Sequence, residues 1–451
     1  MSHTIAAIST GLSVSAIGII RMTGDDCAQI GGKVFKCISG KPLCEAPNRK
    51  LVLGEFHDKE GRVIDSCCAI YTRGPRSYTG EDTVEFHFHG SPAVLTAGLE
   101  SLYLAGARPA GRGEFTKRAF LNGHLDLTQA EAVIDLIEAD TADAAANAAG
   151  QVGGRLQKKL DPIYDDLTNL CSHFHAVLDY PDEDIEDFGL ESYESALHSD
   201  ATALNALLKT YNQGKILRSG VAAAIVGKPN VGKSSLLNAL AGYDRVIVTE
   251  VAGTTRDTVE ETVMVGRTRL RLIDTAGIRE TEDRIEAMGV ERSRQAVENA
   301  DLVIYVCDGS KELDEEDKSV IGFCQTLPKV IGLINKSDLG AAVEVADLPF
   351  ETVIPICAKT GEGLEELSRT VDALFASDTP CDGSILTNTR QADAIRRAYD
   401  AMIRALEGLA LTPDAVLTDV EEAMEAMGEV TGATVREDIT ARIFERFCVG
   451  K

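Results

Sequence analysis

Gly227-Lys228-Pro229-Asn230-Val231-Gly232-Lys233-Ser234 decides the fold of the middle of this chain, because it matches the phosphate-binding pattern GxxxxGK[ST]. The short apolar run Val221–Val226 precedes it, and a helical pattern begins near Lys233. In a strand–loop–helix unit of this kind, backbone N–H groups surround phosphate oxygens and the helix N-terminus adds positive potential. We expect Lys233 to reach the β- and γ-phosphates and the Ser234 hydroxyl to bind Mg²⁺. The flanking strand and helix disfavour the alternative, a Gly-rich turn that matches by chance.

Two later motifs indicate which base the site reads. Asn335-Lys336-Ser337-Asp338 follows the apolar run Val330–Ile334, and Cys357-Ala358-Lys359 follows the run Val353–Ile356. The Asp338 carboxylate can accept hydrogen bonds from N1–H and N2–H₂ of guanine, a pair of donors that adenine lacks. Backbone N–H groups of the second motif would contact guanine O6. The pair therefore predicts GTP rather than ATP, and disfavours a P-loop ATPase or kinase.

Two motifs between the P-loop and Asn335 are typical of loops that sense the γ-phosphate. Asp274-Thr275-Ala276-Gly277 ends the apolar run Leu270–Ile273, so Asp274 can hold Mg²⁺ through water and Gly277 can reach the γ-phosphate. Gly253-Thr254-Thr255-Arg256-Asp257 offers Thr255 as a second Mg²⁺ hydroxyl. Five short motifs in order, each at a strand end, favour a GTPase.

The residue after Gly277 is Ile278, where many small GTPases have a Gln that orients water. An isoleucine cannot polarise water, so catalytic groups must come from elsewhere. Arg256, Arg279 and the acidic stretch Glu280–Glu286 are candidates, although a solvated loop is the simpler interpretation of most of them. A monovalent cation could instead supply positive charge, with the Asn230 amide as a ligand.

The pattern of apolar and polar residues changes along the chain, from strand-like to helical and back, which predicts a multidomain α/β and α architecture. We expect an N-terminal α+β domain at 1–121, a helical domain at 122–215 and 379–451, and an inserted GTPase domain with a mostly parallel sheet at 216–378. The helical domain is then discontinuous, an arrangement that folded domains tolerate. Continuous apolar runs in the inserted part suit strands covered on both faces.

Smaller patterns give local expectations. Thr83–His89 alternates as a strand with Val84, Phe86 and Phe88 on one face, and its His pair is a weaker candidate for a metal site. Cys67 and Cys68 are expected to be buried thiols. Within the helical block, Thr128–Glu131 has the spacing of a capping box, Pro162 is expected at a helix start or kink, and a helix is expected to close near Gly214.

The chain carries 45 Lys and Arg against 71 Asp and Glu, a net charge of −26 that repels a phosphate backbone on average. Any contact with nucleic acid therefore needs a local basic patch, a partner or a flipped-out base. No apolar run is long enough for a membrane span, no signal peptide is evident, and the eleven cysteines lack zinc or disulfide spacing. We expect a reduced, cytoplasmic protein with no membrane contact.

Further motifs span the whole chain and resemble those of the MnmE (TrmE) family of bacterial tRNA-modification GTPases. They are Tyr78–Asp82, Gly113–Asn122, Leu125–Leu127, Gln129–Ala132, Tyr180–Asp184 and the terminal Cys448–Lys451. The resemblance implies a homodimer joined through the N-terminal domain, and a heterotetramer-like complex with the FAD-dependent MnmG. It implies modification of the wobble uridine of tRNA at C5 to an aminomethyl or carboxymethylaminomethyl group. The carbon donor would be a tetrahydrofolate derivative, in its 5-formyl or 5,10-methylene form.

The resemblance also implies roles for individual residues. K⁺-dependent dimerisation of the GTPase domains would trigger hydrolysis, with Asn230, Thr249, Val251 and Thr254 around K⁺ and Glu286 orienting the attacking water. Arg279 and Cys448 are the further catalytic candidates. The folate candidates are Arg21, Glu85, His124 and Lys451. The residues expected to bind GTP are Asn230, Val231, Gly232, Lys233, Ser234, Ser235, Thr249, Thr254, Thr255, Asp274, Thr275, Ala276, Gly277, Asn335, Lys336, Asp338, Cys357, Ala358 and Lys359.

Some candidates have a plainer interpretation. Without the resemblance, Glu85 is a surface strand residue and Cys448 a buried small apolar side chain. The sequence also departs from the family pattern at Thr10–Ser15, where a Gly-rich segment is usual, at His124, often Lys, and at Ser91, usually Gly. A GTP-dependent switch in ribosome assembly is the alternative function, but it would leave the N-terminal motifs without a role.

Overall fold

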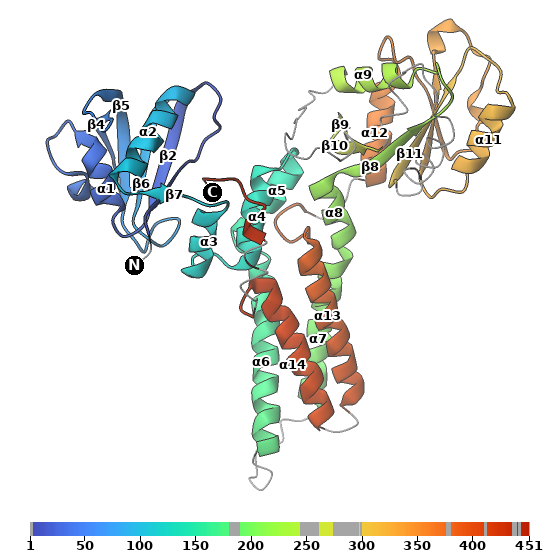
Figure 1. The fold of residues 1–451 in the computed structure, drawn as a ribbon. Coiled ribbons are helices and arrows are strands. Elements are labelled where there is room, and N and C mark those ends of the chain that lie inside the picture. The colour runs from blue at the N-terminus through green and yellow to red at the C-terminus, as the bar shows by residue number, and fades with distance from the viewer. Residues whose placement is uncertain are drawn as a thin grey trace, which may run out of the picture.

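The computed structural model describes residues 3–179, 190–243, 261–273, 297, 300–375, 380–409, 413–434, 440 and 443–450. Figure 1 shows three parts: a long helical domain, and an N-terminal domain and a sheet domain that lie on either side of its upper end. None of the described helices is both long and apolar enough to cross a membrane.

The N-terminal domain is built on a seven-stranded sheet with strand order β3-β4-β5-β6-β2-β1-β7. Its strands and helices are β1 (Ile5–Ile8), β2 (Ser15–Thr23), α1 (Cys27–Val34), β3 (Phe35–Cys37), β4 (Leu51–His57), β5 (Val63–Thr72), β6 (Thr83–Gly90), α2 (Pro92–Ala105), β7 (Arg108–Pro109) and α3 (Glu114–Leu121). Helices α1 and α2 cover one face of the sheet, over a core that includes Phe56, Phe86 and Phe88. The expected alternation in β6 is confirmed, since Val84, Phe86 and Phe88 are buried.

The opposite face of this sheet is not covered by the helices. Strand register places Ile19, His87, Cys68 and Leu53 in one row across it, and Arg21, Glu85, Ile70 and Leu51 in the next. All eight side chains are half-buried or exposed. Of the two adjacent cysteines, only Cys67 is fully buried, because Cys68 points to this face.

The helical domain joins segments from both sides of the inserted domain. It contains α4 (Leu127–Ile137), α5 (Ala142–Val152), α6 (Gln157–Asp179), α7 (Leu190–Lys209), α8 (Tyr211–Ser219), α13 (Thr389–Gly408) and α14 (Pro413–Thr431). One apolar core unites Leu160 and Leu167 of α6, Leu204 of α7, Ile395 of α13 and Met427 of α14. The predicted discontinuous helical domain is therefore confirmed.

The start of α4 differs from the expectation. Asp126, not Thr128, is the N-cap: its Oδ1 accepts from the Gln129 N–H at 2.8 Å, and Gln129 Oε1 accepts from the Asp126 N–H at 3.0 Å. The backbone is still extended at Asp126, so the first free helical N–H groups lie two residues earlier than predicted. Thr128 is buried and donates its hydroxyl to Asp126 at 2.6 Å.

The predicted helix end at Gly214 is wrong. Helix α7 ends at Lys209, Gly214 lies inside α8, and α8 ends before Gly220, whose φ is 74°. A Cβ at Gly214 would lie 2.0 Å from the Leu386 carbonyl oxygen, so this glycine permits a close approach of two segments. Pro162 lies within α6, after its first turn, and not at its start.

The inserted domain contains a six-stranded sheet with order β13-β12-β11-β8-β10-β9, parallel except for the β9–β10 pair. Its elements are β8 (Val221–Val226), α9 (Lys233–Tyr243), β9 (Glu261–Val265), β10 (Thr268–Leu272), β11 (Leu302–Asp308), α11 (Glu315–Cys324), β12 (Val330–Asn335), β13 (Thr352–Pro355) and α12 (Leu364–Phe375). Two apolar clusters, one with Leu236 and Leu367 and the other with Tyr305 and Ile321, pack against the strands. The predicted mostly parallel sheet is confirmed.

Candidate functional site

The P-loop connects β8 to α9, and its backbone requires residues that tolerate positive φ. Gly227, Asn230 and Gly232 have φ values of 150°, 65° and 101°. A Cβ on Gly227 would lie 2.2 Å from the Val306 carbonyl oxygen, and one on Gly232 would lie 2.2 Å from Asn335 Nδ2. The two glycines therefore let the loop sit directly on β11 and β12.

Lys233 spans this loop. Its Nζ donates to the carbonyl oxygens of Gly227 at 2.6 Å and Lys228 at 2.8 Å. The ammonium thus lies inside the curve of the loop, where a phosphate chain would place negative charge. Ser234 and Ser235 follow in the first turn of α9 and are exposed.

Asn335 ties three of the predicted motifs together. Its side chain is buried, Nδ2 donates to the Val231 carbonyl oxygen at 2.8 Å, and Oδ1 accepts from the Ala358 N–H at 3.1 Å. Lys336 Nζ donates to the Asn230 carbonyl oxygen at 3.0 Å. The P-loop, Asn335–Asp338 and Cys357–Lys359 therefore form one site, although up to 132 residues separate them.

Asp338 is exposed at the edge of this site, so its carboxylate is accessible to a ligand. The buried Cys357 thiol lies beside it, with Sγ 3.3 Å from Asp338 Oδ1. Lys359 is exposed next to them. The sequence pattern indicated a role for the Cys357 backbone N–H only, so the contact of its thiol with Asp338 was missed.

The sequence patterns also did not indicate two sets of ion pairs that hold the site. Asp308, the last residue of β11, accepts from Lys336 Nζ at 2.7 Å. Burial alone would raise the pKa of Asp308, but hydrogen bonds from Lys336 and Ser310 lower it below the usual value. Lys228 is held by Asp314 and by Asp317 Oδ2, the latter at 3.2 Å, at the N-terminus of α11. The Lys228 ammonium lowers the pKa of Asp314 to about 2.

Several predicted residues lie outside the described part of the chain. They are Thr249, Val251, Thr254, Thr255, Asp274, Thr275, Ala276, Gly277, Arg279, Glu286 and Lys451.

A second polar site lies on the uncovered face of the N-terminal sheet. Arg21 Nε donates to Glu85 Oε1 at 2.6 Å, and the Arg21 guanidinium lies 5.6 Å from the Tyr78 ring centroid and 5.8 Å from that of Phe115. The neighbouring imidazole of His87 and then the Arg21 guanidinium lower the pKa of Glu85 to about 2, although burial acts in the opposite direction. His87 Nε2 is buried, lies 3.8 Å from Glu85 Oε2 and has no hydrogen-bond partner among the described residues. Among the residues that the structure describes, no group of three His, Cys, Asp or Glu is placed to hold a metal ion.

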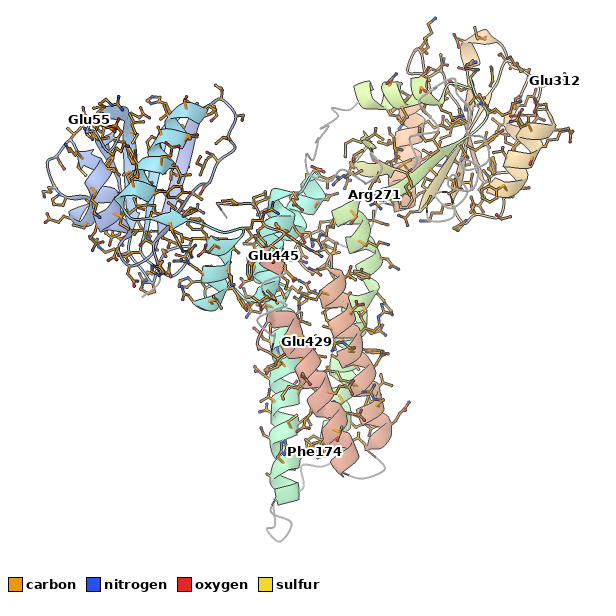
Figure 2. The ribbon with its side chains drawn as sticks, viewed as in Figure 1. Glu55, Phe174, Arg271, Glu312, Glu429 and Glu445 are labelled. Atoms are coloured by element: carbon orange, nitrogen blue, oxygen red, sulfur yellow. The ribbon has the colours of Figure 1, made fainter. Side chains whose placement is uncertain are left out.

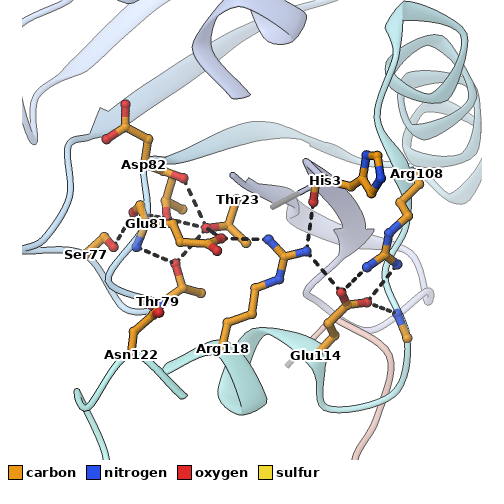
Figure 3. A network of polar contacts seen from close by, with 12 residues as sticks. His3, Thr23, Ser77, Thr79, Glu81, Asp82, Arg108, Glu114, Arg118 and Asn122 are labelled. Carbon is orange, nitrogen blue, oxygen red and sulfur yellow. Dashed lines mark hydrogen bonds and ion pairs between the residues drawn. The ribbon is translucent and has the colours of Figure 1, made fainter. Parts of the chain in front are cut away.

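Arg118 holds the loop that carries Tyr78 (Figure 3). It donates to Glu81 Oε2 at 2.7 Å, to Glu114 Oε1 at 3.1 Å and to the His3 carbonyl oxygen at 2.8 Å. Tyr78 itself shares a 2.9 Å hydroxyl contact with Thr116 of α3. This network fixes the aromatic ring beside Arg21.

The C-terminal segment returns to the same domain, as Figure 1 also shows. The Gly113 N–H donates to the Cys448 carbonyl oxygen at 3.3 Å, and Ser9 Oγ donates to the Gly450 carbonyl oxygen at 3.0 Å. Cys448 is an exposed free thiol, so its interpretation as a buried apolar side chain is wrong. His124 is exposed, and its ring lies against Gly80 in the Tyr78 loop.

A mostly parallel sheet, with a P-loop after β8 and the motif Asn335–Asp338 after β12, defines the class: a P-loop GTPase domain. Family models place the chain more narrowly. Residues 4–124 match the model described as GTP-binding protein TrmE N-terminus, and residues 127–448 match the MnmE helical domain. The chain therefore belongs to the MnmE family.

Curated relatives match this chain along its full length. The tRNA modification GTPases MnmE of Heliobacterium modesticaldum and Aquifex aeolicus are each 40% identical, over 100% of this chain and 100% of the relative. Among solved structures, an Era variant of Aquifex aeolicus bound to GDP and aluminium fluoride is 28% identical. The match covers 41% of this chain and 67% of the Era chain, with a TM-score of 0.27.

Proposed function

We propose that this chain is the GTP-hydrolysing component of an enzyme that modifies the wobble uridine of tRNA at C5. The observation that carries the proposal is the presence, in one chain, of a guanine-nucleotide site and a second, unlike polar site at Arg21–Glu85. The full-length identity of about 40% to tRNA modification GTPases supports joining the two sites to one reaction. The product is an aminomethyl or carboxymethylaminomethyl uridine.

At the nucleotide site, each residue contacts a different part of the nucleotide or a bound cation. Lys233 meets the β- and γ-phosphates, Ser234 and Thr255 hold Mg²⁺, and Asp338 reads the base. Asn230, Thr249, Val251 and Thr254 hold K⁺, which supplies positive charge when two GTPase domains associate. Asn230 is exposed and is held at positive φ in the loop, so its amide oxygen is accessible to a cation. Glu286 orients the attacking water, and Arg279 is a further catalytic candidate.

At the second site, the residues present fit a tetrahydrofolate derivative. The pterin ring of folate offers an amide N–H and an amino group, from which a carboxylate such as Glu85 accepts hydrogen bonds. The guanidinium of Arg21 suits the pterin carbonyl or the glutamate tail of folate, and its contact with Glu85 favours the carbonyl. His87 Nε2, which is buried and has no hydrogen-bond partner among the described residues, can also serve this ligand. The bound folate supplies the one-carbon unit. His124, Lys451 and Cys448 complete the set, with the Cys448 thiol as a candidate for the chemistry.

The protein acts in the cytoplasm as a homodimer. The uncovered face of the N-terminal sheet supports the homodimer, because Leu51 and Leu53 are 57% and 51% exposed there. An exposed apolar row beside a polar site is typical of a surface that a second copy covers. The FAD-dependent MnmG joins the dimer in a heterotetramer-like complex, and tRNA is the shared substrate.

Analysis of modified nucleosides tests the proposal. Transfer RNA from a strain that lacks this gene is expected to lose its C5-modified wobble uridine, and a plasmid copy is expected to restore it. Unchanged C5 modification in the deletion strain would reject the proposal.

The K⁺ role makes a separate prediction. Because Asn230 offers an oxygen ligand and no catalytic Gln follows Gly277, GTP hydrolysis should be at least about tenfold faster in KCl than in NaCl at equal ionic strength. Phosphate release by the full-length chain measures this. Asn230→Ala should remove the difference between the salts, whereas equal rates for the parent chain would count against the K⁺ site.

A further inference from the structure

A chain with a net charge of −26 repels RNA at long range, so an RNA substrate needs a local region of opposite charge. The sequence contains no long basic run. Residues that come together only in the fold can still provide such a region. It would be the place where this protein meets its RNA, so its assignment rests on the proposed function.

One region of the N-terminal domain is strongly basic. Residues 27–50 and 73–76 contain seven basic residues and one carboxylate, Glu45. We call the seven the basic surface: Lys33, Lys36, Lys41, Arg49, Lys50, Arg73 and Arg76. Arg73 is half-buried and the other six are exposed.

The basic surface differs from the other charged regions in its lack of ion pairs. Within the described ranges, none of its seven cations forms an ion pair with a carboxylate. Elsewhere many arginines are paired, as Arg62 is with Asp58 and Arg404 with Asp419. Its positive charge is therefore available to a ligand.

Backbone contacts hold these cations in place without neutralising them. Arg73 donates to the carbonyl oxygens of Cys44 at 3.0 Å and Ala46 at 3.3 Å, and its guanidinium lies 4.8 Å from the Tyr71 ring centroid. Arg49 donates to the Arg76 carbonyl oxygen, and Lys33 Nζ to the Ala105 carbonyl oxygen at 2.8 Å. Arg73 therefore joins the β3–β4 connection to the end of β5.

Three of the lysines line a hollow. Lys33 of α1, Lys36 of β3 and Lys41 surround a groove of about 620 Å³, together with Phe35 and Leu43. Glu55, the β4 residue opposite Lys36, lies at the end of the domain away from the helical domain (Figure 2). Its carboxylate is 3.6 Å from His57 Nε2. Glu55 is therefore a carboxylate residue beside Lys36 at the margin of the basic surface.

The basic surface leads to the Arg21–Glu85 site. Arg73 and Arg76 lie at one end of the loop whose Tyr78 ring contacts Arg21. Two residues of extended chain span at most about 7 Å, so Arg76 and Tyr78 are neighbours. An RNA backbone on the basic surface could therefore present an extruded base toward the second polar site.

We propose that the basic surface binds the phosphate backbone of the RNA substrate, with Lys33, Lys36 and Lys41 as its main contacts. Lysine ammonium groups suit single phosphates, and the arginines add donors along the path. Such contacts give affinity without reading sequence.

Binding of a fluorescently labelled tRNA transcript to the full-length chain tests this surface, with anisotropy measured between 50 and 200 mM KCl. The variant Lys33→Ala/Lys36→Ala/Lys41→Ala should bind about 10–100-fold more weakly at 100 mM salt, and its log–log salt slope should be shallower by about 2 to 3. The matched control Lys158→Ala/Lys159→Ala/Lys209→Ala removes three exposed lysines from the helical domain and should change affinity less than about twofold. Both variants should keep the parental rate of GTP hydrolysis, since neither touches the nucleotide site.

Equal tRNA affinity of the basic-surface variant and its control would overturn the proposal, as would a parent chain that binds no tRNA. A variant that alters self-association in sedimentation velocity but binds tRNA like the parent would assign the surface to a protein interface instead. Either result leaves the proposed function standing, because loss of C5-modified uridine in the deletion strain does not depend on this surface.

Discussion

At the scale of single residues, we propose that Asp338 decides which nucleotide is bound. Its carboxylate can accept hydrogen bonds from two donors of guanine, whereas an amide in its place would present a donor to one of them. Asp338→Asn should weaken GTP binding about 100-fold or more, since each hydrogen bond to a charged group contributes about 1.5–3 kcal/mol. Xanthosine triphosphate should gain affinity, because its O2 accepts from the new amide.

Titration with fluorescent nucleotide analogues measures both changes. The control Glu351→Gln removes an exposed carboxylate of the same domain and should leave binding unchanged. An Asp338→Asn variant that still prefers GTP over xanthosine triphosphate would show that the carboxylate does not read the base.

Glu85 gives the second polar site a pH dependence. Its folded pKa is about 2, below the ordinary value of 4.5, so the charged form stabilises the fold. That contribution is complete above about pH 4.5 and is lost as the pH falls toward 2. Glu85→Gln should lower local stability by about 3 kcal/mol at pH 6 and by about 1–2 kcal/mol at pH 3.

Hydrogen exchange in β2 and β6, compared between parent and variant at each pH, reports this local stability. An equal difference at both pH values would mean that Glu85 acts through packing and not through its charge.

At the scale of elements, an ion pair between the buried Glu131 and the half-buried Arg390 connects α4 to α13. Arg390 donates to Glu131 through Nε at 2.9 Å and Nη2 at 2.8 Å, and Gln391 Nε2 also donates to Glu131 at 2.7 Å. Glu131→Ala should cost about 3–5 kcal/mol because it leaves the Arg390 charge unpaired.

Thermal or urea unfolding of the full chain measures this loss, and the double change Glu131→Leu/Arg390→Met should be less harmful than the single one. As a control, Glu365→Ala breaks the exposed pair with Arg369 and should cost less than about 1 kcal/mol. Similar losses from Glu131→Ala and Glu365→Ala would show that the Glu131–Arg390 pair does not fasten these helices.

The elements that could be predicted are those whose environment is uniform. Strands β8, β11 and β12 are buried on both faces, so their sequences are continuous apolar runs with clear ends. The edge strand β9, with the mixed sequence ETVMV, was not predicted. The role of Gly214 was not predicted, because it depends on the close approach of Leu386. The cap of α4 was placed two residues too late, although its capping box between Asp126 and Gln129 is local.

At the scale of the whole molecule, the switch between helical and strand-like apolar patterns along the chain correctly predicted a helical domain with a domain inserted in it. Distances between motifs could not be predicted in the same way. The link from Asn335 to the P-loop, the return of Cys448 to the N-terminal domain and the thiol beside Asp338 required the fold. Long-range contacts of this kind leave no local pattern in a single sequence.

We propose that the guanine-nucleotide site and the Arg21–Glu85 site serve one tRNA modification. The most direct test is the fraction of C5-modified wobble uridine in tRNA from the deletion strain, complemented with variants of this chain at equal protein levels. Asp338→Asn and Arg21→Ala should each fail to restore the modification, whereas the surface control Arg369→Ala should restore it fully. Full restoration by either Asp338→Asn or Arg21→Ala would contradict the account.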